Sequence, residues 1–92
     1  MKINVKTHAI VITNKSNHLT AELTYFLLPN QDWLLEQLFA DSEANFKKYR
    51  GILIKEFFNR VPKSKHCVRV LDPSAVFYLR KHQGYQKYIH QI

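Results

Sequence analysis

A segment near the C-terminus interleaves tyrosines with cationic side chains, and these residue types together suit nucleic-acid binding. Aromatic rings offer stacking surfaces for bases, while ammonium and guanidinium groups contact phosphates, as in proteins that bind single strands. Tyrosines at helical spacing also pack on the edge of a core with their hydroxyls in water, which is the structural alternative. The candidate residues of this segment are Tyr78, Arg80, Lys81, Tyr85, Lys87 and Tyr88.

A second group of candidates lies on a long helix predicted over residues 42–60. Lys48 and Lys55 fall on one stripe of this helix, opposite its apolar side chains. A face that only keeps a helix in water normally mixes both signs of charge, yet Glu56 is the only acid in residues 46–70. A surface of one sign favours a binding role. The candidates from the helix and the connector after it are Lys47, Lys48, Lys55, Lys63 and Lys65.

Net charge divides the chain after Glu43. Residues 1–43 carry three lysines against five acids, a net charge of −2, whereas residues 44–92 carry eleven lysines and arginines against two acids, a net charge of +9. A concentrated basic surface attracts polyanions over about a Debye length. The division predicts a negatively charged partner, and RNA, DNA and an acidic protein all meet that description.

Three functions fit these residues. The first is a small non-enzymatic nucleic-acid-binding protein that uses the basic helix face and the Tyr/Lys-rich C-terminal segment. The second is an interaction or inhibitor protein, of the type that phages and plasmids encode, which docks its basic surface onto an acidic protein. The third, which the residues favour least, is a metal-free ribonuclease in which His82, Arg80 and Tyr85 position phosphate and transfer protons.

We expect neither a cofactor nor a metal. The five histidines are scattered without metal-ligand spacing, and Cys67 is the only cysteine, so no intrachain disulfide forms. The chain does not open with a signal-peptide pattern, and its apolar runs are shorter than a membrane span requires. These features predict a cytoplasmic protein that does not enter membranes. Edge pairing of its apolar N-terminal hairpin with a second copy would give a homodimer.

The elements that position the candidates are predicted from the periodicity of apolar side chains. Residues 3–13 and 19–27 alternate or carry β-branched residues around a cluster of turn formers, and they predict an N-terminal antiparallel hairpin. After Pro29, the apolar residues of 31–40 predict a short amphipathic helix with Asn30 as its N-cap.

The long helix over residues 42–60 comes next, with Asp41 or Ser42 as its N-cap. Gly51 in its middle marks either a bend or a close contact. Arg50 lies nearer the apolar side of the helix, where its stem can cover the edge of the core.

Residues 67–71 predict a third strand, and the sequence Asp72-Pro73-Ser74 that follows fits two structures. Asp as N-cap with Pro at the first helical position opens a helix, while the same residues make a type I turn before another strand over 75–81. We favour the helix, which Gly84 should interrupt before a short terminal segment around residues 85–90.

We therefore expect residues 1–92 to form a single compact basic domain of the α+β class. A small, mainly antiparallel sheet that includes the N-terminal β-hairpin is covered by the long amphipathic helix. The predicted order is ββααβα, or ββααββ in the alternative.

Overall fold

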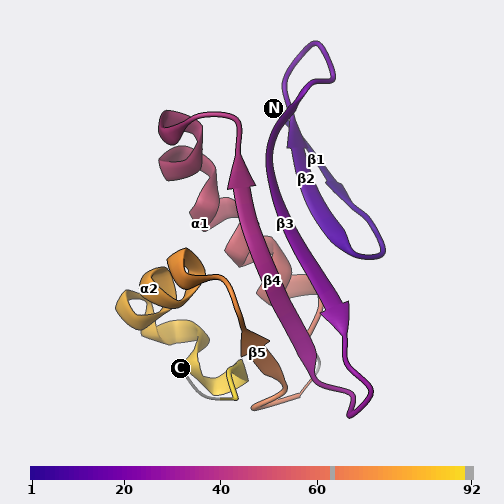
Figure 1. The fold of residues 1–92 in the computed structure, drawn as a ribbon, viewed down its shortest axis with the longest axis vertical. Coiled ribbons are helices and arrows are strands. Elements are labelled where there is room, and N and C mark those ends of the chain that lie inside the picture. Colours follow the sequence, from indigo (N-terminus) through magenta and orange to yellow (C-terminus); the bar gives the residue numbers. More distant parts are fainter. Residues whose placement is uncertain (63, 91–92) are drawn as a thin grey trace.

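A five-stranded sheet forms one layer of the molecule and helices form the other (Figure 1). The computed structural model describes residues 1–62 and 64–90. Strands β1 to β4 are antiparallel neighbours in chain order, and β5 lies parallel to β4 at the end of the sheet. The predicted α+β class with a mainly antiparallel sheet is therefore confirmed. The elements are β1 (Lys2–Val5), β2 (Ala9–Thr13), β3 (Leu19–Leu27), β4 (Trp33–Ala40), α1 (Glu43–Arg60), β5 (Val68–Val70), α2 (Pro73–Lys81) and the three-ten helix η1 (Gln83–Tyr88).

The predicted strand over residues 3–13 is two strands joined by a tight turn. The backbone N–H of Lys6 donates to the carbonyl of Ala9 at 2.7 Å and closes this turn. The turn residues Lys6-Thr7-His8 include no Gly, Pro, Asn or Asp, so the sequence held no marker for it. The predicted hairpin itself is present, because β2 and β3 pair in antiparallel register.

Residues 31–40 do not form the predicted helix, because β4 occupies most of this range and pairs with β3. A β-bulge leaves Glu36 without a partner on β3, since the residues that flank it pair with consecutive residues of that strand. Leu35 and Leu38 are therefore both buried against the helical layer although they are three residues apart. That spacing is typical of a helix and explains the error. The order is ββββαβα followed by η1, so neither predicted order is correct.

The predictions for the second half of the chain are confirmed to within one residue at most ends. Ser42 caps α1, and its hydroxyl accepts a hydrogen bond from the backbone N–H of Asn45 at 3.1 Å. Asp72 caps α2 with Pro73 at the first helical position, so the helical alternative is the correct one. α2 ends at Lys81, before Gly84, which lies within η1.

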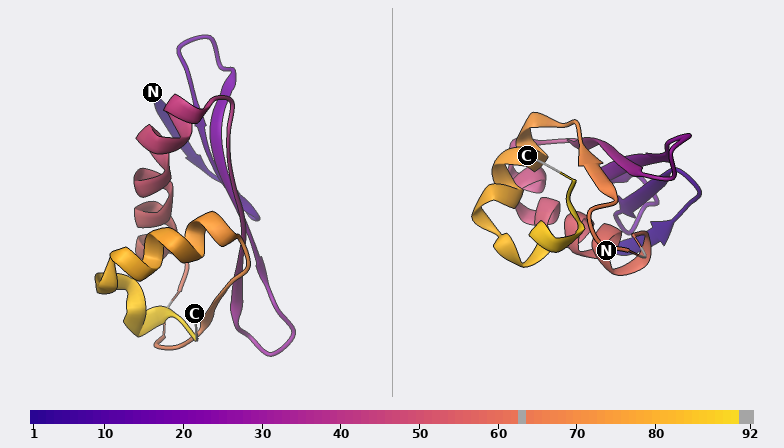
Figure 2. Two further views of the ribbon diagram at one scale, coloured as in Figure 1. Left: turned by 60° about the vertical axis from the view of Figure 1, so that its left-hand side comes forward. Right: turned by 90° about the horizontal axis from the view of Figure 1, so that it is seen from below.

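Both α-helices pack on the same face of the sheet, and within residues 1–62 and 64–90 no helix covers the opposite face (Figure 2). The core between the layers joins Phe57 of α1 to Tyr25 of β3, with ring centroids 5.4 Å apart, and includes Ile10 and Leu23 at full burial. The parallel pairing of β4 with β5 requires the crossover that α1 provides. The sheet thus acts as the support on which the residues after Glu43 are arranged.

β1 forms one edge of the sheet, and in residues 1–62 and 64–90 no second strand pairs with its outer side. An open edge is where a second copy could add its own strand. Dimerisation through this edge stays a prediction. No helix in the same ranges is long and apolar enough to cross a membrane.

Candidate nucleic-acid interface

The division of charge along the chain becomes a division between layers. Residues 1–41, which form β1 to β4, carry three lysines against four acids. Residues 42–62 and 64–90, which form α1, β5, α2 and η1, carry ten lysines and arginines against three acids. α1, α2 and η1 lie on one side of the sheet (Figure 2), and these three elements carry eight of the ten cations.

Most of the predicted cationic candidates are exposed and have no acidic partner in the part of the chain that the structure describes. Lys47 lies 3.4 Å from Glu43 in an exposed ion pair one helical turn away, a type of pair that contributes little to stability. Within the two described ranges, no ion pair involves the other exposed candidates. These are Lys48, Lys55, Lys65, Arg80, Lys81 and Lys87. The candidate Lys63 lies outside the described residues.

The C-terminal tyrosines pack against α1 instead of projecting freely. The ring of Tyr85 stacks on Phe58 with centroids 4.8 Å apart, and Tyr88 contacts the same phenylalanine at 5.8 Å. Both tyrosines are half-buried. Burial raises the pKa of the Tyr85 hydroxyl, and the neighbouring Tyr78 raises it further. Part of each ring is thus used for packing, which leaves Lys87 as the main polar contact that η1 offers.

A separate constellation links α1 to α2 through stacked rings. The guanidinium carbon of Arg50 lies 5.6 Å from the ring centroid of Tyr78 and 6.0 Å from that of Phe46. The Tyr78 ring stacks on His82 with centroids 3.8 Å apart and planes 9° from parallel. The His82 Nδ1 atom lies 2.8 Å from the carbonyl oxygen of Tyr78. We name Arg50, Tyr78 and His82 the stacked platform.

Of the two roles predicted for Gly51, a bend or a close contact, the structure shows the close contact, and its partner is Tyr78 of the stacked platform. A Cβ atom at Gly51 would lie 2.8 Å from the hydroxyl oxygen of Tyr78, closer than real Cβ atoms approach other atoms. The next nearest atom of that ring would lie at 3.6 Å, which is ordinary van der Waals contact. Glycine at this position therefore lets the Tyr78 hydroxyl rest against the backbone of α1.

We expect the effect of Gly51→Ala on stability to depend on the Tyr78 hydroxyl. Alanine is favoured over glycine inside a helix by about 1 kcal/mol, so Gly51→Ala in a Tyr78→Phe background should stabilise the protein by about that amount. In the wild type the displaced hydroxyl should cancel or reverse the gain. Urea unfolding of the four proteins in a double-mutant cycle measures this coupling. Equal effects of Gly51→Ala in both backgrounds would contradict the contact.

Asp72 fixes the start of α2 and joins it to the sheet. Its Oδ1 atom accepts from the backbone N–H of Ser74 at 2.8 Å and of Ala75 at 3.1 Å, and also from the Ser74 hydroxyl. Its Oδ2 atom accepts from the backbone N–H of Leu38 on β4 at 3.0 Å. Burial by itself raises the pKa of this carboxyl, but the hydrogen bonds outweigh it and lower the pKa below its ordinary value of 3.8. One ionised side chain thus sets where α2 lies.

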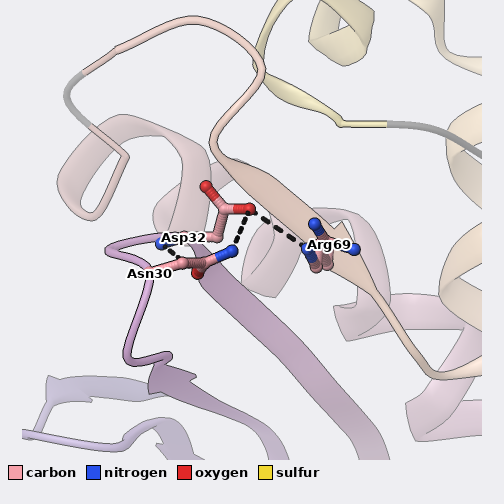
Figure 3. A network of polar contacts seen from close by, with 3 residues as sticks. All are labelled: Asn30, Asp32 and Arg69. Atoms are coloured by element: carbon pink, nitrogen blue, oxygen red, sulfur yellow. Dashed lines mark hydrogen bonds and ion pairs between the residues drawn. The ribbon is translucent and has the colours of Figure 1, made fainter.

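A polar network at the start of β4 connects that strand to β5 (Figure 3). Asn30, predicted as a helix N-cap, instead accepts from the backbone N–H of Asp32 at 3.0 Å, in a turn where Gln31 has a φ of 74°. The Asp32 carboxylate lies 3.1 Å from Nε of Arg69. The charge of Arg69 is therefore used within the protein, unlike that of the exposed lysines.

The structure brings together residues that the sequence prediction kept apart. Arg50 was set aside as a cover for the core, yet it lies against Tyr78 of α2, whose ring in turn stacks on His82 just after that helix. The sequence held a signal for this role, because Arg50 has no acid three or four residues away, whereas Lys47 has Glu43.

Arg80 lies on the opposite side of α2 from Tyr78, since helical residues two positions apart are about 200° apart around the axis. Of the three residues of the ribonuclease hypothesis, only Arg80 lies on α2, since His82 follows that helix and Tyr85 belongs to η1.

The described residues offer neither a metal-binding group nor, beside Arg50, an enclosed cavity. No group of three or more His, Cys, Asp or Glu side chains in the described ranges could hold a metal ion. A shallow hollow beside Phe46 and Arg50 is too small to enclose a water molecule. The candidate site is an exposed basic surface.

Fold and site together define a small α+β protein in which a mixed sheet supports a basic helical layer. No protein-family model, curated protein or solved structure matches this chain.

Proposed function

We propose that this protein is a non-enzymatic nucleic-acid-binding protein whose interface is the exposed side of α1, α2 and η1. The observation that carries the proposal is the gathering of unpaired cations on the helical layer, while the strand-rich residues 1–41 carry a slight excess of acids. Phosphate contacts from such cations supply most of the affinity in non-specific binding.

The repulsion among the cations of the helical layer supports a binding role. Lysines crowded on one layer repel one another in the folded state, and a surface meant only for contact with water would mix both signs. Three of these cations also lie over aromatic rings, which holds their stems in place. The distances from ammonium nitrogen to ring centroid are 5.2 Å for Lys48 and Tyr49, 4.3 Å for Lys81 and Phe77, and 5.2 Å for Lys87 and Tyr88.

We expect binding that weakens steeply with salt. If four to six phosphates are neutralised, the slope of log K against log salt should be about −4 to −5 on duplex DNA and about −3 to −4 on a single strand. Fluorescence anisotropy over a range of salt concentrations gives this slope. A slope near zero, or no binding at low salt, would contradict the proposal, and cleavage of RNA without metal would favour the ribonuclease hypothesis instead.

A second function is favoured by two exposed apolar side chains, Leu71 before α2 and Phe77 beside Lys81 on that helix. Leu71 and Phe77 are 61% and 59% exposed, and an aromatic ring beside lysine is a common anchor in protein interfaces. An acidic protein partner would use both the charge and this anchor. A stoichiometric protein that remains bound after nuclease treatment and is lost with Phe77→Ala would favour this function over nucleic-acid binding.

A further inference from the structure

The stacked platform holds a cation that has no anion. Among the four arginines of the described ranges, Arg60 is paired with Glu56 and Arg69 with Asp32, whereas Arg50 and the exposed Arg80 have no carboxylate partner. Arg50 makes no hydrogen bond or ion pair within those ranges, although it is half-buried. Its guanidinium lies near two aromatic rings, which limits its freedom and leaves its N–H donors for a ligand.

A guanidinium arranged in this way is suited to an oxyanion. Its planar group presents donors in a fixed geometry that matches phosphate, and stacking on a ring leaves these in-plane donors available. The contact to Tyr78 comes from α2, which Asp72 fixes at its start and which the Gly51 contact brings close to α1. The position of Arg50 is thus set before any ligand arrives.

His82 adds a second feature that points to the same ligand. Its Nδ1 atom faces the carbonyl of Tyr78, which accepts a hydrogen bond, so Nδ1 carries the proton and Nε2 is left for other partners. Tyr78 stacks on one side of the imidazole ring, and the residue is exposed. A flat, exposed ring that already ends a stack is a surface on which a further flat ring can bind.

We infer that the stacked platform binds an unpaired nucleotide of a single strand, with a phosphate at Arg50 and a base on His82. This inference rests on the proposed function and makes it more specific, because base stacking requires a base that is not paired within a duplex. The lysines of α1, α2 and η1 then contact neighbouring phosphates without selecting among strands.

The test compares a thymidine oligonucleotide of about 12 nucleotides, an abasic backbone of equal length and a duplex, by anisotropy at about 50 mM salt. We expect the wild type to bind the thymidine strand most tightly. His82→Ala should weaken that binding about tenfold and change binding of the abasic strand less than about twofold. Arg50→Lys keeps the charge but not the planar group, and it should weaken binding of both single strands by about fivefold.

Two further variants separate the platform from charge in general. Arg80→Gln removes one cation on the other side of α2 and should lower the affinity for all three nucleic acids about equally. Lys15 lies in the β2–β3 turn of the sheet layer, so Lys15→Gln should leave all three affinities unchanged. Circular dichroism establishes that each variant is folded.

The outcomes distinguish the inference from the function on which it rests. Salt-dependent binding in which His82→Ala affects the thymidine and abasic strands alike, or in which the duplex binds most tightly, overturns the platform and leaves nucleic-acid binding in place. No binding of any of the three ligands by the wild type overturns both.

Discussion

Replacing Asp72 by alanine is expected to lower the free energy of unfolding by about 2–4 kcal/mol. Loss of a helix N-cap costs about 0.5–2 kcal/mol, and leaving the buried N–H of Leu38 without an acceptor costs about 1–3 kcal/mol more. Both losses occur together, because the two carboxylate oxygens serve α2 and β4 separately. Urea unfolding followed by circular dichroism measures the change.

A graded series tests the cause of this loss. Asp72→Asn keeps one carbonyl oxygen and is a good N-cap, but it has no second acceptor for Leu38, so it should lose about 1–2 kcal/mol. If the alanine variant were within about 0.5 kcal/mol of the wild type, Asp72 would not hold α2 on the sheet.

The contribution of Asp72 should also depend on pH. Its pKa is lower in the folded protein than the ordinary 3.8, so ionisation stabilises the fold above that value, and the stability is lost as pH falls through the folded pKa. The difference in stability between wild type and Asp72→Ala should therefore be full at pH 5 to 7 and should shrink below about pH 4.

The sequence predicted the second half of the chain more accurately than the first for a physical reason. Helix caps and proline act locally, so Ser42, Asp72 and Pro73 mark helix starts without any knowledge of tertiary contacts. β4 depends on its neighbour. Its bulge at Glu36 places Leu35 and Leu38 on one face, and only pairing with β3 distinguishes that arrangement from a helix.

The candidate site, like the fold, was predictable from the sequence only in part. Exposed lysines follow from composition and from the helical wheel, since the polar side of α1 must face water. The stacked platform was not predictable, because Arg50 and Tyr78 are distant in sequence and meet only where α2 packs beside α1. Tyr85 and Tyr88 match the alternative given for them from the sequence, packing on the edge of the core, because Phe58 lies against both rings.

Replacing three helical-layer lysines by glutamine is expected to weaken nucleic-acid binding about 100-fold at low salt. The triple variant changes Lys48, Lys55 and Lys81, which are exposed and have no acidic partner within the described ranges. Each lost phosphate contact should make the salt slope shallower by about 1, so three should reduce it by about 2 to 3. Glutamine has nearly the helix propensity of lysine, so the fold should persist.

A matched control carries the same change of charge on the other layer. Lys2, Lys6 and Lys15 are exposed residues of β1 and the turns beside β2, and their replacement by glutamine also removes three of the positive charges. The decisive measurement is the salt dependence of binding to one labelled oligonucleotide for the wild type and both triple variants. We predict that the control keeps the wild-type slope and an affinity within about threefold of the wild type. The helical-layer variant should show both a shallower slope and weaker binding. Equal losses in the two variants would show that net charge alone drives binding, and would contradict an interface on the helical layer.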